Sequence, residues 1–356
     1  MRRLEEIIGS LPEDAGAAIV TGPYSRRYLT GLNSSAGTLV LTRGGAKLII
    51  DSRYHELAVK TVRGCEVILQ ADNLYEQIRG LLSVCGAKSV LLESAAFTLK
   101  ARNTLRENLA DIALLEDNRL SESLSRLREC KSEAELDKIR AAQRIADATF
   151  GHLLKIIKPG VSEREIALEA ETFGKQAGAD DVAFPLIVAA GASSSLPHAA
   201  PGENKVRGGD TVLIDMGFKV GGYCSDMTRT VVIGKAGTEQ RAVYDTVLRA
   251  QQAAFEKIQR CAICKDVDAA ARELIDASPY KGLFGHGLGH SLGMEVHEPP
   301  GFNKTSGAKL SEGMVLTVEP GIYLPGQFGV RIEDLIVVTD DGYENLTRAP
   351  KHLIEL

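Results

Sequence analysis

The sequence predicts two domains, an α/β domain followed by an α+β domain that contains an internal repeat. The chain has 356 residues, about twice the usual length of one domain. Its first third alternates between short β-rich runs and helical patterns. Its remainder contains two similar segments offset by about 100 residues. We place the boundary between residues 125 and 126, so that the predicted domains are 1–125 and 126–356.

Strands alternate with helices in the first domain, which predicts a mixed sheet covered by helices. Six β-rich runs are the predicted strands: 17–21, 37–42, 47–51, 66–70, 89–93 and 112–116. Three segments between them, 53–62, 74–85 and 99–109, carry apolar residues at helical spacing. This domain has no dense group of His, Asp and Glu, so nothing in it indicates chemistry.

The second domain begins with a predicted long helix. Ser132 and Glu135 have the spacing of a capping box, in which each residue satisfies a backbone amide at a helix start. An amphipathic pattern then runs over residues 134–157 and stops at Lys158-Pro159-Gly160.

The repeat in the second domain aligns four acidic residues in pairs. Asp215 corresponds to Glu319, and Asp226 corresponds to Glu333. All four lie in or beside apolar β-runs, where an uncompensated carboxylate is costly. One such residue is usually an ion-pair partner, but two copies packed about a pseudo-twofold axis would bring four carboxylates to one centre. Such a centre requires concentrated positive charge, and a pair of divalent cations would supply it.

Four of the seven histidines lie between residues 198 and 297, in Gly- or Pro-rich segments. This clustering makes His198, His290 and His297 candidates for the site, whereas we interpret His286 as a supporting or packing residue. An oxygen-rich site with one imidazole favours Mn²⁺ or Co²⁺, with Fe²⁺ or Zn²⁺ as alternatives. Two ions held close together activate water, so hydrolysis is the favoured reaction class.

Composition excludes several other functions. The net charge of −5 gives no basic face for nucleic acid. No apolar run approaches the ~20 residues of a membrane helix, and the charged N-terminus lacks the apolar core of a secretory signal. We therefore expect a cytoplasmic protein that binds neither nucleic acid nor membrane.

Six cysteines are too few for a disulfide scaffold in a chain of this length. Cys261 and Cys264 form a single C-x-x-C pair, which is a weak indication of a zinc or redox site without further ligands nearby. We interpret both as structural.

Residues from about 125 to the C-terminus resemble the pita-bread metallopeptidases, the family of methionine aminopeptidase, aminopeptidase P and prolidase. The first domain resembles the creatinase-type domain of prolidases and aminopeptidases P. The motifs that carry the resemblance are Ser195-Leu196-Pro197-His198, Asp215-Met216-Gly217, Ser225-Asp226-Met227-Thr228-Arg229-Thr230, Gly285-His286-Gly287-Leu288-Gly289-His290, His297-Glu298, Val318-Glu319-Pro320-Gly321-Ile322-Tyr323 and Val330-Arg331-Ile332-Glu333-Asp334.

The resemblance implies a role for each candidate residue. Its metal ligands would be Asp215, Asp226, His290, Glu319 and Glu333, with Asp226 and Glu333 bridging the two ions. Glu319 would also shuttle the proton of the attacking hydroxide. The remaining catalytic residues would be His297 for the tetrahedral intermediate, His198 for substrate binding, Arg331 for orienting Asp215, and Tyr323 for supporting the site.

The implied activity is hydrolysis of the bond between an N-terminal residue and a following proline, by a homodimer with two Mn²⁺ or Co²⁺ ions. Many prolidases carry an arginine shortly after the His-Glu pair, where it can bind the free carboxylate of a dipeptide. Residues 297–302 contain no arginine, so longer peptides are at least as plausible as dipeptides. The alternatives are a broader aminopeptidase of the methionine aminopeptidase kind and, less favoured, a metal-free creatinase-like amidinohydrolase or a non-catalytic binding protein.

Overall fold

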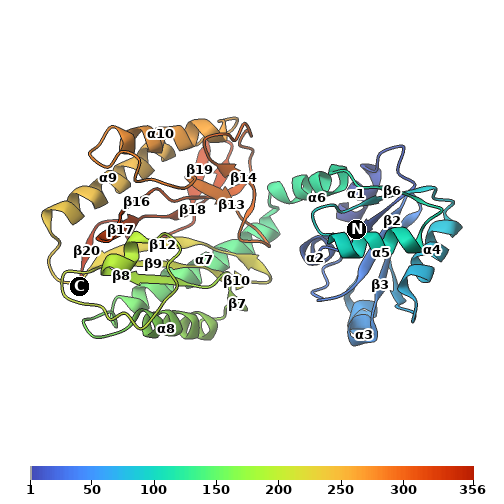
Figure 1. The fold of residues 1–356 in the computed structure, drawn as a ribbon, viewed down its shortest axis with the longest axis horizontal. Helices are drawn as coiled ribbons and strands as arrows, with labels where there is room; N and C mark the ends of the chain where they lie inside the picture. Colours follow the sequence, from blue (N-terminus) through green and yellow to red (C-terminus); the bar gives the residue numbers. More distant parts are fainter. Residues whose placement is uncertain (1) are drawn as a thin grey trace. The chain divides into compact units, whose positions relative to one another are not determined.

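The computed structural model describes residues 2–356, which form two compact units that divide between Arg128 and Glu129 (Figure 1). The boundary expected from the sequence lies inside helix α6 (Arg119–Glu129). Polar residues at the end of this helix do not interrupt it, because Leu120 and Leu124 bury one face while the charged side chains lie on the other. The division at 125/126 therefore stays a prediction.

The first unit contains a six-stranded mixed sheet in the order β4-β3-β2-β1-β5-β6. Its strands are β1 (Ala17–Val20), β2 (Thr38–Thr42), β3 (Gly45–Ile50), β4 (Glu66–Leu69), β5 (Ser89–Leu92) and β6 (Ala113–Leu115). Neighbouring strands β1, β2 and β3 are antiparallel, whereas β4, β5 and β6 each join the sheet in parallel. The predicted α/β class is confirmed.

The helices of the first unit are α1 (Arg2–Gly9), α2 (Pro23–Thr30), α3 (Ser52–Thr61), α4 (Leu74–Val84), α5 (Leu99–Asn108) and α6. Three of them have polar N-caps whose side chains accept backbone amides, which fixes where they begin: Asp51, Asn73 and Thr98. Helices α4 and α5 contribute Ile78, Leu82 and Leu105 to the core against β1 and β5.

The second unit contains two main sheets with the same internal plan. One has the order β20-β12-β9-β8 and the other β14-β13-β15-β18-β19. Strands β9 and β12 pair antiparallel, as β15 and β18 do. The bounds of all strands in this unit are β7 (Asp181–Val182), β8 (Ile187–Ala190), β9 (Thr211–Met216), β10 (Phe218–Val220), β11 (Tyr223–Cys224), β12 (Met227–Val232), β13 (Gly289–Ser291), β14 (Glu298–Phe302), β15 (Val315–Val318), β16 (Gly321–Leu324), β17 (Phe328–Arg331), β18 (Asp334–Thr339), β19 (Gly342–Asn345) and β20 (Ile354–Glu355).

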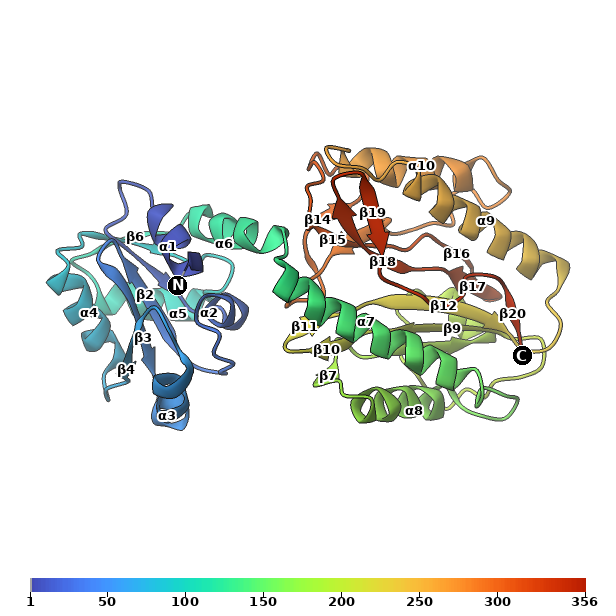
Figure 2. The same ribbon diagram turned by 180° about the vertical axis from the view of Figure 1, so that it is seen from behind.

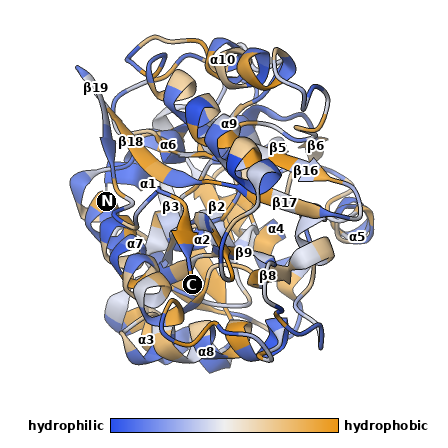
Figure 3. Ribbon diagram, turned by 90° about the vertical axis from the view of Figure 1, so that its left-hand side faces the viewer, coloured by the Kyte–Doolittle hydropathy of each residue, from blue (hydrophilic) through white to orange (hydrophobic). Residues whose placement is uncertain are grey.

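A pair of helices covers the outer side of each sheet. Helices α7 (Glu133–Leu153) and α8 (Glu163–Gln176) lie along β9 and β12 (Figure 2), and α9 (Thr238–Phe255) and α10 (Cys264–Asp276) cover the other sheet. Each pair forms a separate apolar core with its own sheet. Hydropathy colouring shows apolar strands between helices of mixed character (Figure 3). The predicted repeat, with its capping box at Ser132, is therefore present in the structure.

No helix within residues 2–356 is long and apolar enough to cross a bilayer.

No disulfide joins two cysteines within residues 2–356. In the C-x-x-C pair, Cys261 is exposed and Cys264 is buried in the core at the start of α10.

Candidate metal centre

The alternation of side chains along the strands directs Asp215 and Glu319 away from the helices. On β9, Ile214 and Met216 belong to the core beneath α7 and α8, so Asp215 points to the opposite face of the sheet. Val318, the last residue of β15, belongs to the core beneath α9 and α10, so Glu319, which follows it, points away from that core.

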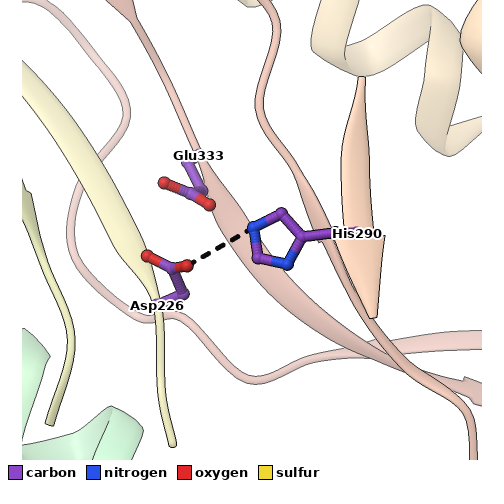
Figure 4. Close-up of side chains that lie close together, drawn as sticks. All are labelled: Asp226, His290 and Glu333. Carbon is purple, nitrogen blue, oxygen red and sulfur yellow. Dashed lines mark ion pairs between the residues drawn. The ribbon is translucent and has the colours of Figure 1, made fainter. Parts of the chain in front are cut away.

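Three predicted ligands lie close enough together to coordinate one ion. One potential ligand atom from each of Asp226, His290 and Glu333 lies within 4.8 Å of the other two. Figure 4 shows Asp226 and Glu333 arriving from different strands, with the His290 ring facing them. His290 Nε2 is 3.6 Å from Asp226 Oδ2 and 3.5 Å from Glu319 Oε1. Asp215 lines the same cavity.

A close approach of backbones places His290 beside Glu319. A Cβ at Gly289 would lie 2.0 Å from the carbonyl oxygen of Thr317, so only glycine allows β13 this near to β15. The His290 amide donates to Thr317 Oγ1 at 3.1 Å, and this hydroxyl donates to Glu319 Oε1 at 3.2 Å. His290 Nδ1 is 3.2 Å from the carbonyl of Ser291. This contact favours a proton on Nδ1 and leaves the Nε2 lone pair directed at the carboxylates.

Arg331 organises one side of the centre. Its guanidinium donates to Asp215 Oδ2 at 2.7 Å, to Tyr323 Oη at 2.8 Å and to Thr228 Oγ1 at 3.0 Å. Thr228 Oγ1 in turn donates to Glu333 Oε2 at 2.6 Å. Arg331 and Glu333 are almost fully buried. The guanidinium thus contacts the Asp215 carboxylate directly and reaches Glu333 through the Thr228 hydroxyl. The role predicted for Arg331 stays a prediction.

Burial raises the pKa of each carboxyl of the centre, and repulsion from neighbouring carboxylates adds to this effect at Asp226, Glu319 and Glu333. Burial raises the pKa of Asp226 well above its ordinary value, and the charges of Glu333, Asp215 and Glu319 raise it further. Burial, with the charges of Glu319 and Asp215, does the same to the pKa of Glu333. Burial raises the pKa of Glu319 to about 8 and lowers that of His290 to about 4. Only additional positive charge would allow all four carboxyls to ionise near neutral pH.

The residues present fit a pair of divalent ions. Asp215 Oδ1 is buried and has no hydrogen-bond partner among the described residues, although its other oxygen is held by Arg331. A buried oxygen without a partner is costly, and a metal ligand is one explanation for it. Four carboxylates and a neutral imidazole are donors that suit Mn²⁺, Co²⁺, Fe²⁺ or Zn²⁺.

The centre lines a cavity of about 650 Å³. His198 and His297 also line it, and the His297 ring lies edge-on to the His290 ring with their centroids 4.3 Å apart. Apolar side chains form another part of the wall: Phe184, Pro185, Ile187, Val296 and Phe302. The cavity therefore joins ionisable groups to a surface suited to an apolar side chain.

His286 has a supporting position, as its interpretation from the sequence expected. Its Nε2 is 2.9 Å from Tyr323 Oη, and its Nδ1 is 2.8 Å from the carbonyl of Gly287. The same Tyr323 hydroxyl accepts from Arg331, which also donates to Asp215. His286 is therefore linked to Asp215 through Tyr323 and Arg331.

Two polar residues that contact the centre or the backbone beside it, Thr228 and Gln251, were not singled out from the sequence. Thr228 lies within a quoted motif, but its link between Arg331 and Glu333 depends on contacts across 103 and 105 positions. Gln251 occupies the apolar face of α9, where a buried amide interrupts the hydrophobic pattern. A glutamine within an otherwise apolar helical pattern was the sequence feature that could have drawn attention to Gln251.

We expect the metal affinity of the apo-protein to rise with pH between 6 and 8. A protonated carboxyl must release its proton before binding a cation. Burial raises the pKa of Glu319 to about 8, and it also raises the pKa values of Asp226 and Glu333. Each released proton contributes about a tenfold gain in affinity per pH unit while pH lies below its pKa. Titration calorimetry with Mn²⁺, in two buffers of different ionisation enthalpy, measures both affinity and proton release. A pH-independent affinity would contradict the expectation.

Comparison with known proteins places this geometry in a family. Residues 137–340 match metallopeptidase family M24, and residues 12–130 match the creatinase/prolidase N-terminal domain. The chain belongs to metallopeptidase family M24. It is therefore a metallopeptidase that uses divalent metal ions, and its catalytic unit has the predicted pita-bread fold.

Relatives of this M24 peptidase are similar over nearly their whole length. A Xaa-Pro dipeptidase of Pyrococcus furiosus is 32% identical, with 99% of each chain covered. The structure of a Xaa-Pro dipeptidase from Bacillus anthracis is 36% identical with a TM-score of 0.96, covering 100% of this chain and 99% of that one. The structure of an X-Pro aminopeptidase from Thermotoga maritima is 32% identical with a TM-score of 0.91, covering 99% and 100%.

Proposed function

We propose that this M24 peptidase hydrolyses the peptide bond between an N-terminal residue and a following proline, with two divalent ions held by Asp215, Asp226, His290, Glu319 and Glu333. The observation that carries the proposal is the convergence of four carboxylates and one neutral imidazole on a partly apolar cavity. The names of the similar proteins supply the proline preference. A complete ligand set disfavours a metal-free amidinohydrolase, and the N-terminal domain disfavours a methionine aminopeptidase.

When bound, the ions lower the pKa of a water and polarise the scissile carbonyl. The Glu319 carboxylate would accept a proton from the attacking water and deliver it to the departing nitrogen, acting first as a general base and then as a general acid. His297 and His198 line the cavity and donate hydrogen bonds to the substrate, His297 to the developing oxyanion. Arg331 and Tyr323 hold Asp215 in place.

We further propose that the substrates extend beyond dipeptides. Among the described residues lining the cavity, Arg331 is the one arginine, and there is no lysine. Its guanidinium is already engaged by Asp215, Tyr323 and Thr228. The free carboxylate of an Xaa-Pro dipeptide would therefore have no uncommitted guanidinium or ammonium group to bind in this cavity, whereas a longer peptide places its carboxylate farther away.

One assay tests both proposals. The apo-enzyme is restored with Mn²⁺, Co²⁺ or Zn²⁺ in parallel and is then offered Ala-Pro, Ala-Pro-Ala and Met-Ala-Ala. We expect activity only with metal, no cleavage of Met-Ala-Ala, and cleavage of Ala-Pro-Ala at least as efficient as that of Ala-Pro. Preferred cleavage of Met-Ala-Ala would overturn the proline preference, and cleavage of Ala-Pro alone would overturn the proposal on substrate length.

Three finer properties complete the proposal. We assign Mn²⁺ or Co²⁺ as the native metal, on the oxygen-rich donor set. A homodimer follows from the family resemblance, and light scattering of the purified enzyme tests it. A cytoplasmic location is supported by the exposed cysteines Cys85, Cys130 and Cys261, which form no disulfide within residues 2–356.

Replacing His297 by alanine should lower kcat by ~10²–10³-fold, because a donor to the oxyanion is lost. The His297 ring touches His290 but belongs to the substrate side of the centre, so bound metal should be retained. Steady-state kinetics and elemental analysis of the same sample check both statements. Loss of metal from the variant would instead identify His297 as a ligand.

A further inference from the structure

The side-chain amide of Gln251 bridges the two strand segments that carry Glu319 and Glu333. Its Nε2 donates to the carbonyl of Val318 at 2.9 Å and to the carbonyl of Ile332 at 3.2 Å. Each of these carbonyls belongs to the peptide group immediately before one of the two glutamates. One amide therefore holds the backbone at both positions.

The opposite ends of the same two peptide groups are also held. The amide of Glu319 donates to the carbonyl of Leu288 at 2.8 Å, and the amide of Glu333 donates to the carbonyl of Thr228 at 3.1 Å. With Gln251 on the carbonyl side, both polar atoms of each peptide group have partners. This arrangement fixes the rotation of the two peptide planes, and with it the direction in which each glutamate side chain leaves the backbone.

The other half of the repeat shows that helix packing does not require a glutamine here. Buried positions on α9 correspond to buried positions on α7 that lie 101 residues earlier, as Val247 does to Ala146 and Ala254 to Leu153. At the same offset, Gln251 corresponds to Phe150, which is 1% exposed and packs in the apolar core. The corresponding position in the other half of the repeat is therefore filled by an apolar side chain, so packing of the helix on its sheet does not require a glutamine.

Gln251 also carries a cost that stability alone does not explain. It is fully buried, and its Oε1 has no hydrogen-bond partner among the described residues. A buried acceptor without a partner costs about 1–3 kcal/mol. Buried polar groups that lack a hydrogen-bond partner are often found beside functional sites, where the function outweighs their cost in stability.

We propose that Gln251 is a positioning residue of the metal centre, which sets the spacing and orientation of Glu319 and Glu333 by bridging the backbone before each. This inference rests on the proposed function, because it takes the two glutamates to be metal ligands. Groups that orient ligands typically affect metal affinity or activity by ~10–100-fold.

The test replaces Gln251 by methionine, which keeps the volume and removes the donor. The matched control is Gln143→Met, which removes another fully buried glutamine, on α7, whose side-chain atoms have no hydrogen-bond partner among the described residues. Mn²⁺ binding to each apo-protein is measured by titration calorimetry, and kcat and KM are then measured over a range of Mn²⁺ concentrations. Thermal unfolding of the apo-proteins provides the comparison of stability.

We expect Gln251→Met to bind Mn²⁺ ~10–100-fold more weakly than the parent. Its kcat should rise with excess Mn²⁺, and its KM for Ala-Pro-Ala should change little. Gln143→Met should bind Mn²⁺ as the parent does. Equal affinity in Gln251→Met and the parent would overturn the inference while leaving the proposed function intact, whereas absence of Mn²⁺ binding by the parent would overturn both.

A folding defect is separated from a positioning defect by a second variant. If Gln251→Met does not fold, Gln251→Glu is measured in the same way, because its neutral carboxyl keeps the shape but can donate only one hydrogen bond. Weaker Mn²⁺ binding by this folded variant supports the inference, and parental affinity overturns it. Failure of both variants to fold would assign Gln251 to stability and would also overturn it.

Discussion

Replacement of Glu319 by alanine is expected to abolish hydrolysis of Xaa-Pro peptides, with a loss in kcat of ~10⁴-fold or more. The change removes a carboxylate that lies 3.5 Å from His290 Nε2 and whose pKa burial raises to about 8. The variant would thus lose both a metal ligand and the group that carries the proton. Either loss alone would slow turnover. Two of the neighbouring carboxyls are engaged elsewhere, because Asp215 accepts from Arg331 and Glu333 accepts from Thr228.

Two further variants separate the roles of Glu319. Glu319→Gln keeps the shape and one oxygen but cannot carry a proton, so metal should bind while turnover remains lost. Glu344→Ala removes a glutamate of the same unit that pairs with Arg140 at the surface, and it should leave kcat unchanged. Kinetics in buffer saturated with Mn²⁺ check all three proteins. Retained activity in Glu319→Ala under these conditions would refute both assigned roles.

Much of the first unit could be predicted because its signals are local. The strand predicted at 17–21 is observed at Ala17–Val20, and the helix predicted at 53–62 is observed at Ser52–Thr61. Helix α2 (Pro23–Thr30) was missed because its stabilisation is not local. At the start of this helix, the amide of Gly22 and the hydroxyl of Ser25 both donate to the Glu93 carboxylate. Glu93 lies 71 and 68 positions away from them in the sequence.

The candidate site was predictable for a different reason. The duplicated segments mark Asp215 with Glu319 and Asp226 with Glu333 through their position beside apolar strands, and the structure brings these residues to one cavity. Their assignment as ligands stays a prediction. The partner of Gln251 could not be predicted from the sequence, because it is the backbone carbonyl of Val318 and a backbone carbonyl is present at every position. The polar residue on the apolar face of α9 was the one local indication.

The second prediction with a large expected effect concerns the buried ion pair between Arg229 and Asp334 and its contribution to the free energy of unfolding. Arg229 is 1% exposed, belongs to β12 and contacts the segments around Asp334 and Ala349. Its guanidinium donates to Asp334 Oδ1 at 2.7 Å and to the backbone carbonyls of Ala349 and Pro350 at 2.8 and 3.0 Å. Asp334 is itself fully buried. Removing one partner of a buried ion pair leaves an uncompensated charge and costs about 3–5 kcal/mol.

We therefore expect Arg229→Met to lower the free energy of unfolding by about 3–5 kcal/mol. Lys351 also contacts Asp334, at 2.7 Å, and it would offset only part of the loss because it cannot replace the bonds to the two carbonyls. The matched control is Arg260→Met, whose pair with Asp340 is more than half exposed on both sides. Exposed pairs contribute about 0–1 kcal/mol, so this variant should unfold almost as the parent does.

Urea unfolding of the apo-proteins, followed by circular dichroism, measures both variants against the parent. The same comparison separates the effect of Arg229 on stability from the effects of the metal-centre residues on activity.

The Arg229 guanidinium also donates to the backbone carbonyl of Glu333, so it helps to hold the backbone of this proposed ligand. Loss of Arg229 should lower stability without metal, whereas Glu319→Ala should lower activity and remove a repulsive buried carboxyl. Equal unfolding midpoints for Arg229→Met and Arg260→Met would show that the buried pair with Asp334 contributes no more than a surface pair.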